Sequence, residues 1–192
     1  AARGYEGRLV IAASHGIVPP LQLMEALQQI HDANPQLKIS GYRSVAKGID
    51  RDLKSGSCDV GITIGCLNTD ANDLCGMVID RLQWALVMPL SHPLASNTRL
   101  LVEDLDGLNI ISSGDHAENV QMLIEELDSR GVHPVINTLK DVSTAVFWAE
   151  MGLGAVLHFT GTILSGNSNL AIRPIEGLDE WPVMRSEEHT SE

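Results

Sequence analysis

A serine and a histidine follow one another at the end of an apolar segment near the start of the chain. Residues 9–13 read LVIAA, and Ser14 and His15 come next, before a Pro19-Pro20 pair that suits the first turn of a helix. A hydrolase would pair a serine nucleophile with a histidine base, but adjacent residues of an extended chain point to opposite sides. The sequence has no Gly-x-Ser-x-Gly motif either. We therefore expect no catalytic residue and interpret Ser14 as a ligand contact, with a helix cap or a solvated loop serine as alternatives.

Apolar strands and amphipathic helices alternate along the chain, which predicts an α/β protein with parallel strands. The expected strands are residues 9–13, 37–41, 60–64, 77–79, 84–88, 109–112, 135–139 and 153–159. Helices are expected over residues 20–33, 44–56, 115–130 and 141–151, with Ser44, Asp115 and Asp141 as their caps. The pattern describes two similar α/β units, one after the other.

Polar or glycine residues stand at the carboxyl ends of the predicted strands in both units. In open parallel sheets this edge is where ligands bind. The residues in question are Ser14, His15, Ser44, Gly65, Ser112, Ser113, Gly114 and Asp141. Two such edges facing each other would form a cleft between the units, a favoured place for a small-molecule site.

Composition excludes several classes of protein. The formal net charge of −12 argues against these residues binding nucleic acid phosphates themselves. The three cysteines lack CxxC spacing, so we expect neither a zinc site nor a disulfide framework. Asp59 has no second ligand at metal spacing, and we expect no metal and no cofactor. No apolar run is long enough for a membrane span.

Three further features have structural interpretations. His158 lies in an apolar strand and is expected to be a core histidine with its hydrogen bonds satisfied, and His92 is expected to be structural. The last eight residues, 185–192, match the translation of a sequencing-library adapter, so we set them aside as an artefact. Under this interpretation the genuine sequence stops at Met184, before its natural end.

Five segments, in order and spacing, resemble the effector-binding domain of LysR-type transcriptional regulators. They are residues 7–11 (GRLVI), 34–37 (NPQL), 53–62 (LKSGSCDVGI), 86–95 (LVMPLSHPLA) and 152–156 (GLGAV). The resemblance implies two Rossmann-like subdomains of periplasmic-binding-protein type, joined by two crossover segments. It implies that subdomain I contains residues 7–87 and 161–184, and that subdomain II contains residues 88–160.

The resemblance also implies a function. A small, anionic metabolite would bind between the subdomains and control DNA binding by an amino-terminal winged helix-turn-helix that this sequence lacks. The implied ligand-binding residues are Ser14, His15, Ser44, Val45, Gly65, Ser113, His116 and Asp141. We expect a cytoplasmic protein without membrane contact that forms dimers or tetramers through the helices at 20–33 and 118–130. The alternatives are the solute-binding protein of a transporter and, less favoured, a small enzyme on the same fold.

Overall fold

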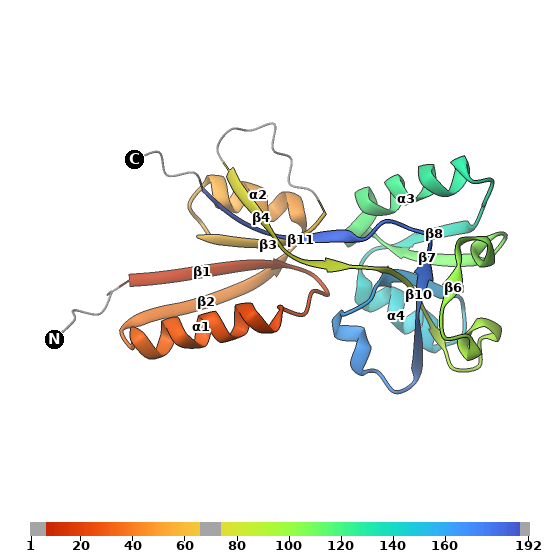
Figure 1. Cartoon of the computed structure of the whole chain (residues 1–192), viewed down its shortest axis with the longest axis horizontal. Coiled ribbons are helices and arrows are strands. Elements are labelled where there is room, and N and C mark those ends of the chain that lie inside the picture. Colours follow the sequence, from red (N-terminus) through yellow and green to blue (C-terminus); the bar gives the residue numbers. More distant parts are fainter. Residues whose placement is uncertain (1–6, 66–73, 189–192) are drawn as a thin grey trace. The chain divides into compact units, whose positions relative to one another are not determined.

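The computed structural model describes residues 7–65 and 74–188, which form two compact units (Figure 1). The first unit contains the described residues up to Arg81 together with those from Pro182 onward, and the second contains Leu82–Trp181. Each unit has its own mixed sheet with helices packed against it. The predicted α/β class with two subdomains is confirmed.

The first unit is built on a five-stranded sheet with the order β2-β1-β3-β11-β4. Its elements are β1 (Gly7–Ser14), α1 (Leu21–Ala33), β2 (Leu37–Ser44), α2 (Ala46–Lys54), β3 (Val60–Ile64), β4 (Leu74–Leu82) and β11 (Trp181–Glu188). Strand β1 pairs in parallel with β2 and β3, whereas β11 pairs antiparallel with β3. The first three strands therefore form the β-α-β-α-β arrangement that the sequence pattern predicts.

The two faces of this sheet are covered differently (Figure 1). On one face Val10 and Ala12 of β1 are buried together with Ile49 and Leu53 of α2. On the other face α1 lies over a hollow of about 420 Å³ whose lining includes Ile11 of β1. Helix α1 has no fully buried residue. Alternate residues of β1 point to opposite faces, so only one of its two apolar sets enters a closed core.

The second unit is built on a six-stranded sheet with the order β6-β10-β5-β9-β7-β8. Its strands and α-helices are β5 (Trp84–Pro89), β6 (Leu100–Leu101), β7 (Asn109–Ser113), α3 (Ala117–Ser129), β8 (Val135–Leu139), α4 (Val142–Glu150), β9 (Ala155–Phe159) and β10 (Leu170–Glu176). Short 3-10 helices occupy Pro93–Ser96, Val102–Leu105, Gly114–His116 and Ile163–Gly166. Strand β7 pairs in parallel with β8 and β9, and β5 pairs antiparallel with β9 and β10.

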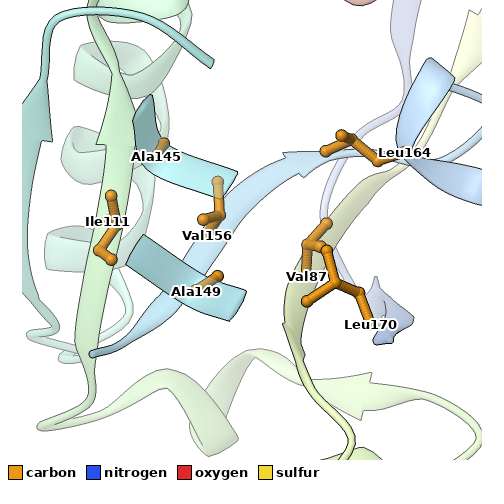
Figure 2. Close-up of a cluster of buried hydrophobic side chains, with 7 residues drawn as sticks. All are labelled: Val87, Ile111, Ala145, Ala149, Val156, Leu164 and Leu170. Atoms are coloured by element: carbon orange, nitrogen blue, oxygen red, sulfur yellow. The ribbon is translucent and has the colours of Figure 1, made fainter. Parts of the chain in front are cut away.

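Small residues let α4 pack closely on this sheet. Ala145 and Ala149 are completely buried against Val156 of β9, with Ile111 of β7 close by (Figure 2). Val87 of β5 belongs to the same cluster. An alanine adds no bulk beyond its Cβ, so the helix axis can approach the strands and leave few voids.

The boundaries of the units differ from those implied by the resemblance. Strand β5 would belong with residues 7–87, but it pairs with β9 and β10 in the second sheet. Strand β10 would belong with residues 161–184 and also lies in the second sheet. The two compact units divide after Arg81 and after Trp181. Residues 185–188, which we set aside, extend β11, with Arg185 and Ser186 in register with β3; residues 189–192 lie outside the described part of the chain.

Three predicted helix starts are wrong and one is confirmed. Pro20 is extended, with ψ of 146°, and precedes the first residue of α1 instead of lying in its first turn. Ser44 ends β2, and Val45 is the residue that caps α2. Asp115 does not cap α3, because the chain first makes a 3-10 turn and the helix begins after His116. Asp141 does cap α4, and its Oδ1 accepts a hydrogen bond from the Thr144 N–H at 2.8 Å.

Candidate functional site

Two serines lie side by side at the carboxyl edge of the first sheet. Ser14 is the last residue of β1 and Ser44 the last residue of β2, and the two are partners in the parallel register. Ser14 is buried and Ser44 half-buried. The hydrogen bonds formed within the described part of the chain do not use either hydroxyl. The edge therefore presents two neighbouring hydroxyl groups that are available to a ligand oxygen.

Backbone contacts hold this pair in place. The Arg43 Nη1 donates to the Ser14 carbonyl oxygen at 2.7 Å, which ties the end of β1 to β2. The Ser44 hydroxyl lies over the first turn of α2, where a Cβ added at Gly48 would overlap it. Glycine at position 48 leaves room for the serine side chain beside the helix start. The first turn of a helix carries backbone N–H groups without intrahelical acceptors, and such groups favour anions.

The other three candidates of the first unit lie at the same edge. His15 is half-buried in the turn after β1, and Val45 is exposed at the start of α2. Gly65 follows β3 with φ of +97°, a conformation that favours glycine, and its N–H donates to the Pro182 carbonyl at 2.9 Å. The Gly65 position thus joins the end of β3 to β11.

The three candidates of the second unit lie at the carboxyl edge of β7 and β8. Ser113 ends β7, and its hydroxyl accepts a hydrogen bond from the Asp115 N–H at 3.1 Å. His116 is buried and immediately precedes α3. Asp141 caps α4, and the Asp115 carboxylate also accepts a bond from the α4 start, at the Val142 N–H. The structure thus places five candidates at one edge and three at the other.

The sequence predicts His158 to be a core histidine with its hydrogen bonds satisfied, and the structure confirms only its burial. Its burial is as expected, with 1% of its surface exposed, but its hydrogen bonds are not satisfied. Nδ1 accepts from the Phe159 N–H at 2.7 Å, while Nε2 has no hydrogen-bond partner among the described residues. Burial, with a smaller contribution from His116, lowers the pKa of His158 to about 3. A histidine within an apolar strand was the signal in the sequence, but it cannot show which nitrogen is bonded.

The structure also bears on metals, thiols and membranes. Within residues 7–65 and 74–188 no group of three or more His, Cys, Asp or Glu side chains is placed to hold a metal ion. Cys58 is buried, which raises the pKa of its thiol, Cys75 is exposed, and Cys66 lies outside the described residues. No helix in this part of the chain has the length and apolar character to cross a membrane.

Comparisons with known proteins agree with this architecture. The effector binding domain of QuiR in complex with shikimate has a TM-score of 0.80 at 14% identity, covering 98% of this chain and 90% of that one. The BenM effector binding domain with its effector benzoate has a TM-score of 0.77 at 20% identity, covering 97% and 86%. Full-length CbnR complexed with its target DNA has a TM-score of 0.77 at 15% identity, covering 97% of this chain but 63% of CbnR.

A search of curated protein sequences found no match. The model of the family described as LysR substrate binding domain, in contrast, matches residues 2–185 of the 192 in this chain. These residues include both units and both candidate edges. The chain therefore belongs to the LysR substrate binding domain family.

Proposed function

We propose that this chain is the effector-sensing domain of a bacterial LysR-type transcriptional regulator and that its effector is a small carboxylate. The observation that carries the proposal is the pair of neighbouring hydroxyls, Ser14 and Ser44, at the carboxyl edge of a parallel sheet. A hydroxyl can donate to a ligand oxygen, and the start of α2 adds backbone N–H groups and a favourable field. This set of groups favours an anionic oxygen over a cation.

The ligands of the structural neighbours have the same chemistry. Shikimate and benzoate, the ligands of the QuiR and BenM domains, both carry a carboxylate. These proteins are at most 20% identical to this chain, so the likeness supports the class of ligand and not its identity. The proposed site residues are the eight candidates, with Ser14 and Ser44 as the principal contacts.

Regulation would follow from a shift in conformational populations. A ligand that binds one arrangement of the protein more tightly favours that arrangement, and an oligomer transmits the change to the DNA-binding domain. Full-length CbnR, of which this chain covers 63%, has been solved in complex with its target DNA. We propose that this domain likewise acts within a cytoplasmic DNA-binding protein and has no catalytic activity.

Self-association is part of the proposal. Helix α1 exposes Leu21, Met24 and Ile30, and α3 exposes Met122, which are apolar residues on the two helices that the resemblance implicates. Exposed apolar clusters of this kind favour protein interfaces over solvent. The family match favours this regulatory role over a transporter's solute-binding protein.

The proposal is tested with a panel of small carboxylates and their neutral analogues. Thermal unfolding and calorimetric titration compare benzoate with benzamide, and shikimate with its methyl ester. We expect at least one carboxylate to raise the unfolding temperature, because a ligand of the native state stabilises it by mass action, and its neutral analogue to have little effect. Equal effects of the acid and the neutral compound, or no effect of any carboxylate, would contradict the proposal.

A further inference from the structure

The first unit contains a hollow that the proposed function does not use. It lies between α1 and the face of the sheet that is turned away from α2 (Figure 1). Its volume is about 420 Å³, and pockets that hold small molecules in proteins measure about 300–1,000 Å³. The residues that line it all belong to the first unit. The hollow is therefore large enough for a small ligand that contacts one unit alone.

Most of the side chains around this hollow are aliphatic. The helix contributes Leu23 and Leu27, and the sheet contributes Ile11, Ala13 and Ile39. Both leucines are only half-buried, although they lie on the side of α1 that faces the sheet. Covering their exposed apolar surface with a ligand would be favourable, in proportion to the area removed from water. The walls therefore suit the hydrocarbon part of a ligand.

The described residues that line the hollow include one cation and no acidic residue. The cation is Arg43, whose Nη1 donates a hydrogen bond to the Ser14 carbonyl oxygen at 2.7 Å. No carboxylate in the described part of the chain is paired with this guanidinium. An arginine has five N–H donors in a planar fork, so most of them remain for an anion, and a carboxylate matches the fork best. The formal net charge of the chain is −12, which makes a cation without an acidic partner all the more notable.

Strand register places the cation beside the apolar part of the hollow. Arg43 of β2 is the partner of Ala13 of β1, and Ala13 is the partner of Ile62 of β3. Gly41 lies on the same face of β2, two residues before Arg43, and has no side chain to fill the space there. A ligand on this face can thus place a charged group at Arg43 and a hydrocarbon chain over Ala13 and Ile11.

The serine hydroxyls of the proposed effector site belong to the opposite face. Ser14 follows Ala13 and Ser44 follows Arg43, and successive side chains of a strand alternate between the two faces. The Ser44 hydroxyl lies over the first turn of α2, which confirms this assignment. The hollow and the pair of serines are therefore two separate places on the same sheet.

We propose that the hollow under α1 is a second ligand site, which binds an aliphatic carboxylate with its charged group on Arg43 and its chain against the aliphatic side chains of α1 and the sheet. Charge complementarity and the apolar lining favour this occupant over a polar or cationic one. Met24, Gly41 and Arg43 line the hollow and are exposed, so a ligand can enter from solvent. The inference goes beyond the proposed function, because it involves neither the serine hydroxyls nor the second unit.

The test uses octanoate as the probe and octan-1-ol, which has the same chain length without the charge, for comparison. Ala13→Leu and Leu27→Phe fill the hollow from the sheet and from the helix. Arg43→Gln removes the charge and keeps an N–H donor for the Ser14 carbonyl. Lys38→Gln is the matched control, since it removes an exposed cation from the other face of the same strand. Calorimetric titration measures affinity, and unfolding at pH 7 without ligand verifies that each variant folds.

We expect octanoate to bind the unaltered chain and to raise its unfolding temperature by mass action. Ala13→Leu and Leu27→Phe should each weaken both compounds at least about tenfold, because the added hydrocarbon occupies their space. Arg43→Gln should weaken octanoate at least about tenfold and leave octan-1-ol within about threefold, because only octanoate uses the charge. Lys38→Gln should leave both compounds within about threefold.

Ser14→Ala distinguishes this inference from the proposed function. Octanoate should bind Ser14→Ala within about threefold of the unaltered chain. If octanoate binding is lost in Ser14→Ala and kept in the two filled variants, octanoate occupies the serine edge, and the inference is overturned while the proposed function stands. If octanoate binds as expected but none of the carboxylates in the panel described above does, the proposed function is contradicted and the second site stands.

Three further outcomes would overturn the inference. Octanoate might fail to bind the unaltered chain, or might bind both filled variants as tightly as that chain. Equal losses of octanoate and octan-1-ol in Arg43→Gln would show that the position matters for shape and not for charge. Sedimentation velocity covers the remaining occupant: if both filled variants lose self-association and octanoate does not compete with it, the hollow receives a side chain from a second copy of the chain.

Discussion

In the second unit every residue of β9 and five of the six residues of β5 are buried, whereas in the first unit four of the five residues of β3 but no residue of the edge strand β2 are buried. In the second unit α4 packs closely on the sheet through two small buried residues, Ala145 and Ala149, whereas α1 of the first unit lies over a hollow. Both units come from the same alternation of strands and helices. The difference shows that a similar local pattern can build either a closed core or a sheet with one open face, depending on what packs against it.

The closed core of the second unit should contribute most to stability. Truncating a side chain in a strongly buried element lowers the free energy of unfolding, because the neighbouring side chains cannot collapse fully into the space left behind. The open face of the first unit tolerates change but leaves apolar surface available for contacts. Core positions of the second unit should therefore affect folding, and edge positions of the first unit should affect binding.

The largest expected effect comes from the aromatic core of the second unit. Phe159 is completely buried and stacks on Trp84, with ring centroids 4.1 Å apart. We expect Phe159→Ala to lower the free energy of unfolding by about 3–5 kcal/mol. Leu27→Ala, on the half-buried side of α1, should cost about 1 kcal/mol or less, since its side chain borders a hollow.

Urea unfolding measures both changes, and the tryptophans report on one unit. All three tryptophans, Trp84, Trp148 and Trp181, lie in the second unit, so their fluorescence follows that unit while circular dichroism follows both. Equal costs for Phe159→Ala and Leu27→Ala would show that the two units are packed alike and would remove the contrast.

The second prediction concerns binding at the edge of the first unit. Ser14→Ala removes a hydroxyl that would donate to a charged ligand oxygen, worth about 1.5–3 kcal/mol, so affinity for a binding carboxylate should fall about 10- to 150-fold. The free energy of unfolding should change by less than about 1 kcal/mol, because the hydroxyl forms no hydrogen bond within the described residues. Ser57→Ala, at an exposed serine of the same unit, is the control. Calorimetric titration that finds affinity within twofold would exclude Ser14 as a contact.

The third prediction is a pH dependence that originates in the second unit. His158 has its pKa lowered to about 3, whereas in the unfolded chain it titrates near 6.5. Below pH 6.5 the unfolded chain binds a proton that the native chain does not, so stability falls as pH decreases from 6.5 toward 3. The loss is about 1.4 kcal/mol per pH unit, or about 2 kcal/mol at pH 5. Unfolding curves at pH 7 and pH 5 should show this loss in the unaltered chain and lack it in His158→Leu; parallel pH dependences in the two proteins would contradict it.

The smallest effect is expected on the exposed side of the first unit. The Tyr42 hydroxyl donates to Asp52 Oδ2 at 2.7 Å, and this bond raises the pKa of Tyr42 and lowers the pKa of Asp52. Tyr42→Phe should return the Asp52 pKa toward its usual value, which carboxyl NMR can follow, without a measurable change in unfolding. An Asp52 pKa that does not move would show that Arg51, which also contacts this carboxylate, accounts for its shift.

Much of the fold was predictable from local pattern. Residues 60–64 and 135–139 occur as strands with the predicted bounds. For residues 60–64 the reason is burial, since a short apolar run between turn residues has few other ways to bury its side chains, and four of its five residues are buried. The cap at Asp141 was predictable because a carboxylate before a helix satisfies N–H groups within the same turn. The edge position of Ser14 also follows from local sequence, since it comes directly after the apolar run of residues 9–13, whereas Ser44 ends β2 because the pairing with β1 continues past the predicted strand.

Other features depend on contacts between distant residues. Strand β5 joins the second sheet through hydrogen bonds to β9, more than 60 residues away in the chain, and β10 joins it by pairing with β5. Asp115 serves α4 and not α3 because parallel pairing of β7 with β8 brings the two strand ends together. The burial of His158, with one nitrogen that has no partner among the described residues, and the hollow under α1 arise in the same way. A local pattern determines which side chains are apolar and where turns occur, but burial and hydrogen-bond partners are settled only when elements far apart in the sequence pack together.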